Sequence, residues 1–433
     1  MEYLEHETSE VNPNSKTRVL FASLVGTTIE FFDFYIYATA AVLVFPHLFF
    51  PESSGSAALL QSLATFSIAF IARPIGAVIF GHLGDRIGRK ATLVAALLLM
   101  GISTICIGLL PTYAQIGVAA PILLALCRLG QGLGLSGEWS GAVLFATENA
   151  PKGKRAWYGM FPQLGSPIGF ILAASSFLLL GAFLSDEAFL AWGWRIPFIA
   201  SALLVFVGLY IRLKLHESPA FQNVLNQKKA SKAPFKDVVT KHMGKILLGT
   251  LATVCTLVVF YLMTIFALNW GTSALGYSRD DFLKMQLIAT VCFALCIPIS
   301  AILAEKYGRK ITSIAICILT IIFGLFFSKF FVADDALSVL VFLCLGLAIM
   351  GLTYGPLGTI LSEIFPVSVR YTGTALAYNF GSILGASFAP LIATKLAQNY
   401  GLYAVGYYLS IAACVSLFAF ICIRETKNEN IMS

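Results

Sequence analysis

The sequence is poor in charge. Only 12% of its 433 residues are Asp, Glu, Lys or Arg, whereas 58% are hydrophobic. About one quarter of the residues of a soluble domain are charged. The composition therefore excludes an ordinary soluble protein and indicates a chain that crosses a membrane many times.

The usual catalytic signatures are also missing. The five histidines are scattered, and the close pair Cys292 and Cys296 fits neither a CxxC redox motif nor a zinc knuckle. No GxxxxGK[ST] loop is present. We therefore expect no enzyme activity, no metal or cofactor, and no ATP-driven pump. The first 18 residues are polar and carry four glutamates, unlike a secretory signal peptide.

What the sequence has in abundance is apolar runs. Each is about 20 residues long, enough to cross about 30 Å of hydrocarbon, and helices satisfy their own backbone hydrogen bonds in lipid. The sequence thus predicts an all-α integral membrane protein with twelve transmembrane helices. The predicted spans are 19–46, 57–83, 91–110, 119–147, 157–182, 196–213, 245–270, 283–304, 311–329, 337–361, 371–395 and 402–423.

The positive charges predict the topology. Most of the 29 lysines and arginines lie in the two termini and in the loops after the second, fourth, sixth, eighth and tenth helices. By the positive-inside rule, both termini are expected to be cytoplasmic. The net charge of +7 is then a consequence of topology, and nucleic-acid binding is not implied.

The chain divides into two similar halves. We expect a tail (1–18), a six-helix bundle (19–214), a central loop (215–244), a second bundle (245–423) and a tail (424–433). GHLGDRIGRK (81–90) is echoed by AILAEKYGRK (301–310), and GSPIG (165–169) by GSILG (381–385). Further pairs, each 215 residues apart, are Glu148 and Glu363, Pro151 and Pro366, and Arg155 and Arg370. Such duplication is typical of transporters whose site lies between the halves.

The first of these motifs carries a family resemblance. GHLGDRIGRK resembles the signature loop of the major facilitator superfamily; in the second copy Ala301 replaces the glycine, and Glu305-Lys306 replaces Asp-Arg. The whole chain from about Lys16 to Thr426 resembles the metabolite:proton symporter family, which includes carriers of shikimate, alpha-ketoglutarate, citrate and proline/betaine. The stretches that carry this resemblance are GTTIEFFDFYIYA, ARPIGAVIFGHLGDRIGRK, GEWSGA, WGWRIPF and LHESPAF. It implies two pseudo-symmetric six-helix bundles in which the third helix of each triplet faces lipid.

A few charged residues lie inside the predicted spans. They are Glu30 and Asp33 in the first helix, Arg73 in the second, and Arg128 and Glu138 in the fourth. A charge at membrane depth costs about 2.5–3.5 kcal/mol on insertion scales, so a functional role is the default interpretation. The alternative is that these charges only pair with one another to hold the helices together.

Proton coupling is the chemistry that these residues suit. Gly26, Glu30, Asp33 and Tyr37 form one stripe of the first helix. Burial and a nearby arginine shift the proton affinity of a carboxylate in opposite directions, so rocking of the carrier would change that affinity. We predict Asp33 as the proton carrier, and the resemblance to proton-coupled sugar porters implies Arg128 as its partner. Glu30 joins the proton-coupling set, in a second cluster with Arg73 and Glu138; which arginine meets which acid stays open.

The substrate is predicted to be a small organic acid, either shikimate-like or a di- or tricarboxylate. Two arginines in the cavity favour this class because a guanidinium matches a carboxylate. Single polar residues in spans often only bond between helices, which is the alternative for the neutral candidates. The predicted substrate-binding residues are Arg73, Gln131, Glu138, Tyr37, Tyr261, Asn269, Gln286, Tyr354, Tyr378 and Asn379.

The loops between the helices predict a cytoplasmic gate. Asp85 can sit at the start of a neighbouring helix or against Arg155, which would hold the cytoplasmic side shut. Simple positive-inside orientation is the alternative for the basic residues. The predicted gate residues are Gly81, Asp85, Arg86, Gly88, Arg89, Glu148, Arg155, Glu217, Glu305, Arg309, Glu363 and Arg370.

Together these features predict a secondary active transporter that imports its substrate with protons across the bacterial inner membrane by alternating access. Its expected partners are a small metabolite, protons and the lipid bilayer, and we expect a functional monomer. The alternatives are a uniporter or organic-anion exchanger, a symporter of compatible solutes such as proline or betaine, and a nutrient receptor that binds without transport.

Overall fold

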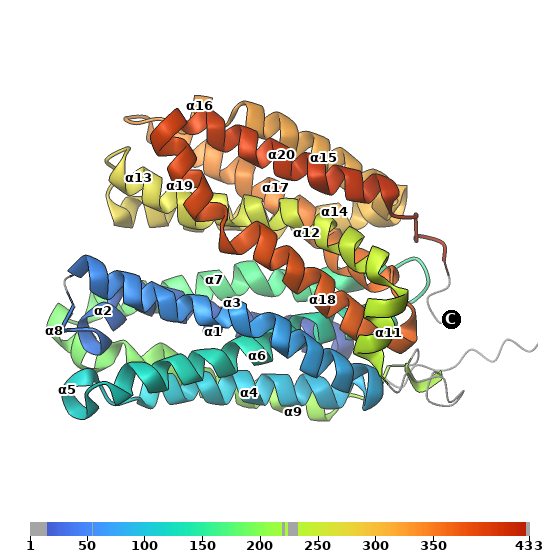
Figure 1. The fold of residues 1–433 in the computed structure, drawn as a ribbon, viewed down its shortest axis with the longest axis horizontal. Coiled ribbons are helices and arrows are strands. Elements are labelled where there is room, and N and C mark those ends of the chain that lie inside the picture. The colour runs from blue at the N-terminus through green and yellow to red at the C-terminus, as the bar shows by residue number, and fades with distance from the viewer. Residues whose placement is uncertain (1–14, 54, 219–220, 224–232, 430–433) are drawn as a thin grey trace, which may run out of the picture.

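The computed structural model describes residues 15–53, 55–218, 221–223 and 233–429. Parts of the predicted tails (1–18 and 424–433) and of the central loop (215–244) therefore lie outside the described residues. The described part is helical, and two groups of long helices lie one above the other (Figure 1). The all-α prediction is confirmed.

The lower group in Figure 1, in blue to green, is the N-terminal half. Its long helices are α1 (Lys16–Leu43), α3 (Gly55–Arg86), α4 (Arg89–Leu109), α6 (Ala119–Glu148), α7 (Arg155–Phe183) and α9 (Arg195–Leu213). Short elements connect them: α2 (Phe45–Phe49), α5 (Tyr113–Ile116), α8 (Asp186–Ala188) and the π-helix η1 (Phe189–Gly193).

The upper group, in yellow to red, is the C-terminal half. Its long helices are α12 (Met243–Tyr261), α14 (Arg279–Tyr307), α15 (Arg309–Leu325), α17 (Ala336–Glu363), α18 (Arg370–Ser382) and α20 (Leu402–Cys422). The π-helix η2 (Leu262–Phe266) joins α12 to α13 (Ala267–Ser273), and η4 (Ile383–Ser387) joins α18 to α19 (Ala389–Tyr400). The remaining elements are α11 (Pro234–Lys241), α16 (Phe327–Phe330) and the 3-10 helix η3 (Val367–Val369).

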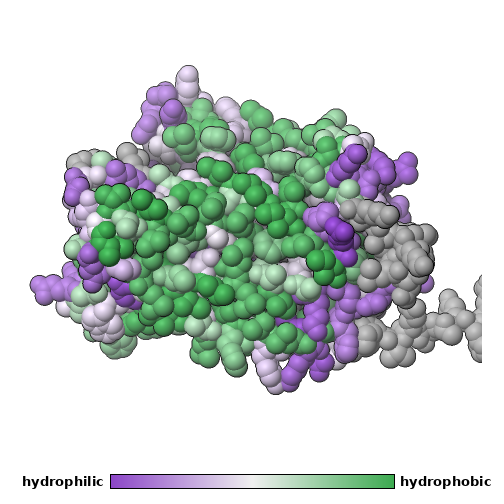
Figure 2. Space-filling model, turned by 60° about the horizontal axis from the view of Figure 1, so that its bottom comes forward, coloured by the Kyte–Doolittle hydropathy of each residue, from purple (hydrophilic) through white to green (hydrophobic). Residues whose placement is uncertain are grey.

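Eleven spans in the described part of the chain are long and apolar enough to cross a membrane. The twelfth predicted run, 311–329, forms α15 and α16. The 17 residues of α15 reach the lower limit of about 17–25 for a spanning helix. Figure 2 shows the matching surface, with a broad apolar belt flanked by hydrophilic side chains at both ends of the long axis.

The repeated glycine motifs pack one helix onto another in each half. A Cβ at Gly165 of α7 would lie 2.7 Å from the Thr27 carbonyl carbon of α1, and one at Gly381 of α18 would lie 2.7 Å from Thr253 Cβ of α12. Small residues allow such close helix contacts inside a membrane. GSPIG and GSILG thus have the same packing role, and they align α1 with α12 in the duplication.

Candidate functional site

We call the end of the bundles where α3 meets α4 and α14 meets α15 the loop end; it lies at the right in Figure 1, beside α11. Asp85, in the last turn of α3, accepts hydrogen bonds there from the backbone N–H groups of Tyr371 (3.0 Å) and Thr372 (2.8 Å). These groups open α18, where an anion is favoured by unpaired N–H groups and the helix dipole. An acid of one half therefore caps a helix of the other half. The predicted position at the start of a neighbouring helix matches this contact, and the alternative contact with Arg155 does not occur.

The second half repeats this contact in the opposite direction. Glu305, near the end of α14, accepts from the N–H groups of Ala156 (2.5 Å) and Trp157 (3.4 Å) at the start of α7. The two halves are thus tied together twice, by equivalent acids.

Each acid belongs to a buried ion network. Arg89 pairs with Asp85 (3.1 Å) and Glu148 (3.2 Å), and Glu148 also lies 3.4 Å from Arg370 of the other half. Arg89 further donates to the Val367 carbonyl at 3.0 Å.

The matching network of the second half has the same form. Arg309 pairs with Glu305 (3.1 Å) and Glu363 (3.3 Å), and Arg155 of the first half lies 3.0 Å from Glu363. Nearly all of the predicted gate acids and arginines are therefore brought together at the loop end.

Further residues complete both networks: Glu217, which was predicted, and Glu425, Ser218 and Thr426, which the sequence analysis did not select. Glu425 accepts from the N–H groups of Arg309 and Lys310, both at 3.0 Å, as Glu217 does from Arg89 (3.0 Å) and Lys90 (3.2 Å). Burial raises the pKa of Glu217. A usable signal was present: an acid-hydroxyl pair, Glu217-Ser218 and Glu425-Thr426, follows the sixth helix of each half.

The hydroxyls of these pairs bind the central acids. Ser218 donates to Glu148 at 2.5 Å, and Thr426 donates to Glu363.

Gly88, another predicted gate residue, precedes α4 with φ +126°, in the left-handed region that favours glycine.

The remaining gate candidates differ in their contacts. A Cβ at Gly81 would lie 2.8 Å from Thr372 Cα, so this glycine permits α3 to approach α18. Arg86 is exposed and forms no ion pair within the described ranges. Its predicted place in the gate network has no support from contacts.

At membrane depth, the carboxylate of Asp33 is in contact with two hydroxyl groups. Thr104 of α4 donates to its carboxylate at 2.7 Å and Ser201 of α9 at 2.6 Å. Asp33 is almost fully buried, and it forms no ion pair with any described residue. The expected pairing with Arg128 is therefore absent in this conformation, because the carboxylate turns toward α4 and α9. Both hydroxyls lie on helices that were expected only to face lipid.

Arg128 still connects to Asp33, through two side chains. It donates to Gln131 Oε1 at 3.0 Å, and Gln131 Nε2 donates to Thr104 at 2.7 Å. The guanidinium also lies 4.1 Å from the centroid of the Tyr37 ring, and Tyr37 bonds to Thr65 at 2.7 Å. We call Arg128, Gln131, Thr104 and Asp33 the relay.

Glu138 has a partner that the sequence analysis missed. Arg212, near the end of α9, forms a buried bidentate pair with it, with one N–O distance of 2.6 Å. Gly26 makes room for this pair, because a Cβ there would lie 2.6 Å from Glu138 Oε1 and 2.9 Å from Arg212 Cζ. The expected cluster of Glu30, Arg73 and Glu138 thus gains a fourth member, because Arg73, Glu138 and Arg212 all lie close enough to Glu30 to interact with it electrostatically, while Glu138 forms its ion pair with Arg212.

Glu30 and Arg73 lack such partners. Glu30 Oε2 and Arg73 Nε are buried and find no hydrogen-bond partner among the described residues. The Arg73 guanidinium lies 4.8 Å from the Phe70 ring centroid and 5.4 Å from that of Phe34. The Nε–H donor of this buried guanidinium is therefore unused.

Between this layer and the loop end, side chains of both halves meet. Trp139 of α6 stacks on Tyr378 of α18 with ring centroids 3.7 Å apart. Its indole N–H lies 2.9 Å from Gln163 Oε1 and 3.0 Å from the Tyr354 hydroxyl. Two predicted substrate residues, Tyr354 and Tyr378, thus lie at the seam, together with Trp139 and Gln163, which were missed.

The other neutral candidates have less support. Tyr261 packs against Phe70 of the other half, with ring centroids 6.3 Å apart. Gln286 donates to the carbonyls of Met263 (2.9 Å) and Thr264 (2.8 Å), inside the π-helix η2. Asn379 bonds to its own helix at Ala375, and Asn269 is exposed.

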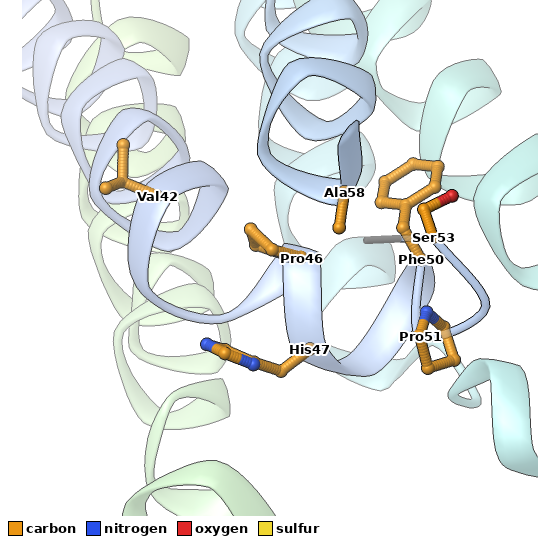
Figure 3. A pocket seen from close by; sticks show the side chains of 7 residues that line it. All are labelled: Val42, Pro46, His47, Phe50, Pro51, Ser53 and Ala58. Carbon is orange, nitrogen blue, oxygen red and sulfur yellow. The ribbon is translucent and has the colours of Figure 1, made fainter. Parts of the chain in front are cut away.

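A cavity of about 350 Å³ opens at the end opposite the loop end (Figure 3). None of the predicted site residues lines it. The lining residues come from α1, α2, the α2–α3 connection and α3, and are Val42, Pro46, His47, Phe50, Pro51, Ser53 and Ala58.

The arrangement of two six-helix groups around a shared seam is that of a polytopic membrane carrier with the major facilitator fold. A solved structure of the proton:xylose symporter XylE, bound to 6-bromo-6-deoxy-D-glucose, superimposes with a TM-score of 0.78 at 18% identity and covers 96% of this chain and 98% of that one. The inward-open xylose transporter XylE from Escherichia coli gives 0.65, also at 18% identity, with coverages of 96% and 98%.

The sequence comparisons define the family. Residues 19–246 and 245–433 match the family model described as Sugar (and other) transporter, and the chain belongs to this family. It is 54% identical to the inner membrane metabolite transport protein YhjE of Escherichia coli, covering 99% of this chain and 98% of that protein.

More distant relatives are also carriers. The identity is 34% to the shikimate transporter of Escherichia coli, with 95% of each chain covered. It is 33% to the proline/betaine transporter of Salmonella typhimurium, covering 95% of this chain and 84% of that one. The relatives and structural neighbours are transporters, and the protein is not an enzyme.

Proposed function

We propose that the protein imports a small organic acid together with protons across the bacterial inner membrane, as a single chain working by alternating access. The observation that carries this proposal is a pair of buried arginines, Arg73 and Arg128, that form no ion pair with any described acid. An unpaired buried cation is costly, and a bound carboxylate would remove that cost. The name of the shikimate transporter, a relative, agrees with this class of substrate.

Asp33 is proposed as the proton carrier. Its two hydroxyl partners can donate to a carboxylate, and each can also accept from a carboxylic acid. The site can therefore hold either protonation state without leaving a polar atom unpaired, which an arginine partner could not do.

The relay supports coupling to substrate. In the present arrangement each donor of the relay points from Arg128 toward Asp33. A substrate carboxylate on Arg128 would compete with Gln131 for the guanidinium. Gln131 and Thr104 could then reorient, which favours a protonated Asp33.

The loop-end networks are proposed as the cytoplasmic gate, closed in this conformation, with both termini cytoplasmic. Opening would withdraw Asp85 from the start of α18 and Glu305 from the start of α7. The seam at Trp139 would separate in the same movement.

Uptake into proteoliposomes tests the proposal. Purified protein is given an inward proton gradient and a panel of labelled shikimate, succinate, fumarate, proline and betaine, with a pH dye inside the vesicles. We expect uptake of a carboxylic acid with internal acidification. Saturable uptake of betaine but of no carboxylic acid would overturn the substrate class, and binding without flux would indicate a receptor.

Asp33→Asn tests the proton carrier in the same vesicles. We expect gradient-driven uptake to fall at least about tenfold, equivalent to about 1.4 kcal/mol, while exchange of internal for external substrate persists. Asp281→Asn, at an exposed position at the start of α14, is the control. Unchanged gradient-driven uptake in Asp33→Asn would exclude Asp33 as the carrier.

A further inference from the structure

The buried charges at membrane depth are balanced in number. Away from the loop-end networks, the buried charged residues in the described part of the chain are three acids and three arginines, all in the N-terminal half. Glu138 and Arg212 neutralise each other. The four others, Glu30, Asp33, Arg73 and Arg128, form no ion pair with any described residue.

The two free arginines lie close to each other. Their Cζ atoms are 5.4 Å and 5.3 Å from the centroid of the same ring, Phe34. The sum of these distances, about 10.7 Å, is the most that can separate the two atoms. Two like charges at this spacing repel each other in a medium of low dielectric constant. One ligand with an anionic group at each end could satisfy both.

The groups that face the two acids differ. Arg73, Glu138 and Arg212 are close enough to Glu30 to interact with it electrostatically. From the other half, the hydroxyls of Tyr354 and Tyr378 face it as well. Asp33 is faced by the hydroxyls of Thr104 and Ser201 and by no described charged group.

We infer that transport is charge-balanced: the substrate binds through two carboxylates, one at each free arginine, and Glu30 and Asp33 each take up one proton for it. This inference rests on the proposed function. Without substrate, two carboxylates offset two guanidiniums and the core is neutral. With a dianion bound, the core carries two negative charges until both acids are protonated.

Neutrality in both states links the two fluxes. A carrier that is loaded with substrate but lacks protons would have to change from one open side to the other with a net charge in its core. Such a charge is disfavoured in a medium of low dielectric constant. Each acid takes its proton from water on the side where the substrate enters and returns it on the other side. The inference therefore predicts two protons for each dicarboxylate and no movement of net charge.

Proteoliposomes with a fixed proton gradient and a potassium diffusion potential test this directly, with succinate, fumarate and shikimate as probes. We expect two protons for each dicarboxylate taken up, and equal accumulation at 0 mV and at about 100 mV, inside negative. One uncompensated charge would instead change the accumulation by roughly 50-fold at 100 mV. Potential-dependent uptake of a dicarboxylate by the unmodified protein overturns the inference.

Two variants sharpen the test. In Glu30→Gln, the number of protons taken up with each dicarboxylate should fall from two to one. An inside-negative potential should then oppose this uptake, because one negative charge enters in each cycle. In the double variant Glu30→Gln/Arg73→Gln the core is balanced again, with one unpaired acid and one unpaired arginine. A monocarboxylate should therefore be preferred, and the potential should have no effect on its uptake. Asp281→Asn is the control for both, and thermal unfolding of each variant checks that it is folded.

The outcomes separate this inference from the proposed function. Proton-coupled uptake of shikimate with no uptake of either dicarboxylate overturns the inference and leaves the proposed function standing. Failure of every carboxylic acid, or uptake without proton movement, overturns the proposed function itself.

Discussion

At the loop end, each half repeats the other; at membrane depth, the two halves differ. The spacing of the gate residues aligns α6 with α17 and α9 with α20, and the glycine motifs align α1 with α12. These alignments locate the counterparts of the charged residues Glu30, Glu138 and Arg212 and of Gly26, which packs against the last two. The counterparts in the C-terminal half are Ala252, Thr256, Thr353 and Phe420.

These four counterparts line one small void of about 10 Å³. Where one half has a buried ion pair and a free acid, the other has neutral side chains around a small gap. Closing the proposed gate between the two halves requires matched contacts from both. Handling of charge requires acids and bases in only one, and a second buried ion pair would add its own desolvation cost. The duplication was therefore retained where the halves meet symmetrically and lost where one copy is sufficient.

The largest expected effect comes from breaking the asymmetric ion pair. Arg212→Met leaves Glu138 buried without its cation, which should destabilise the protein by about 3–5 kcal/mol. Thermal unfolding of the purified protein measures this. Glu138→Leu/Arg212→Met, which imitates the neutral second half, should recover most of the loss; equal instability of both variants would contradict an electrostatic origin.

A smaller effect is expected from crowding the same pair. Gly26→Ala places a methyl group against Glu138 and Arg212, and overpacking of this kind costs about 1–3 kcal/mol. Gly181→Ala in α7, where a Cβ would meet nothing within 4 Å, is the matched control and should leave stability unchanged or slightly raised. Thermal unfolding again provides the comparison, and equal effects of the two substitutions would be evidence against a close contact at Gly26.

Next come the symmetric caps of the loop end. Asp85→Asn and Glu305→Gln each remove a charge from a helix start, a loss of about 1 kcal/mol, while Arg89 and Arg309 keep their ion pairs with Glu148 and Glu363. Hydrogen exchange should then speed up by about fivefold at the amides of Tyr371 and Thr372 in the first variant, and at those of Ala156 and Trp157 in the second. If one variant accelerates exchange at both helix starts, the gate opens as a unit; if neither start responds, the caps do not hold it.

The smallest expected effect concerns the π-helix of the C-terminal half. Gln286→Leu removes the amide that donates to Met263 and Thr264, which should cost about 1 kcal/mol. Unfolding measurements beside Asn269→Leu, at an exposed position in the next helix segment, would show whether the loss is specific. A drop in substrate affinity without loss of stability would instead return Gln286 to the predicted binding site.

Much of the fold was predictable because apolar runs and repeated motifs are local properties of the chain. The helices and most gate residues follow from such patterns. Partners at membrane depth did not follow, because they depend on the rotation of each helix. Arg212 lies in the last turn of its helix, where a basic residue looks like a topology signal. Its long side chain reaches back to a partner deeper in the bundle, which the position in the helix does not reveal. Thr104 and Ser201 carry no charge, so nothing in the sequence distinguished them from ordinary helix residues.

The predicted residues thus divide into two groups. The gate set was predicted from the duplicated spacing together with the motifs of the family resemblance, and most of its acids and arginines lie together at the loop end. The roles proposed for the gate, proton and substrate residues remain predictions, as do the domain boundaries. The contacts described above define how to test these roles.

The stack between Trp139 and Tyr378 has a practical consequence. An indole at 3.7 Å from a phenol ring of the opposite half emits in a way that depends on that neighbour and on the bond of its N–H to Tyr354. If the halves separate at this seam, both contacts break at once. The protein therefore carries its own optical probe, and a version that retains only this one of its five tryptophans would report each turn of the transport cycle as a change in light.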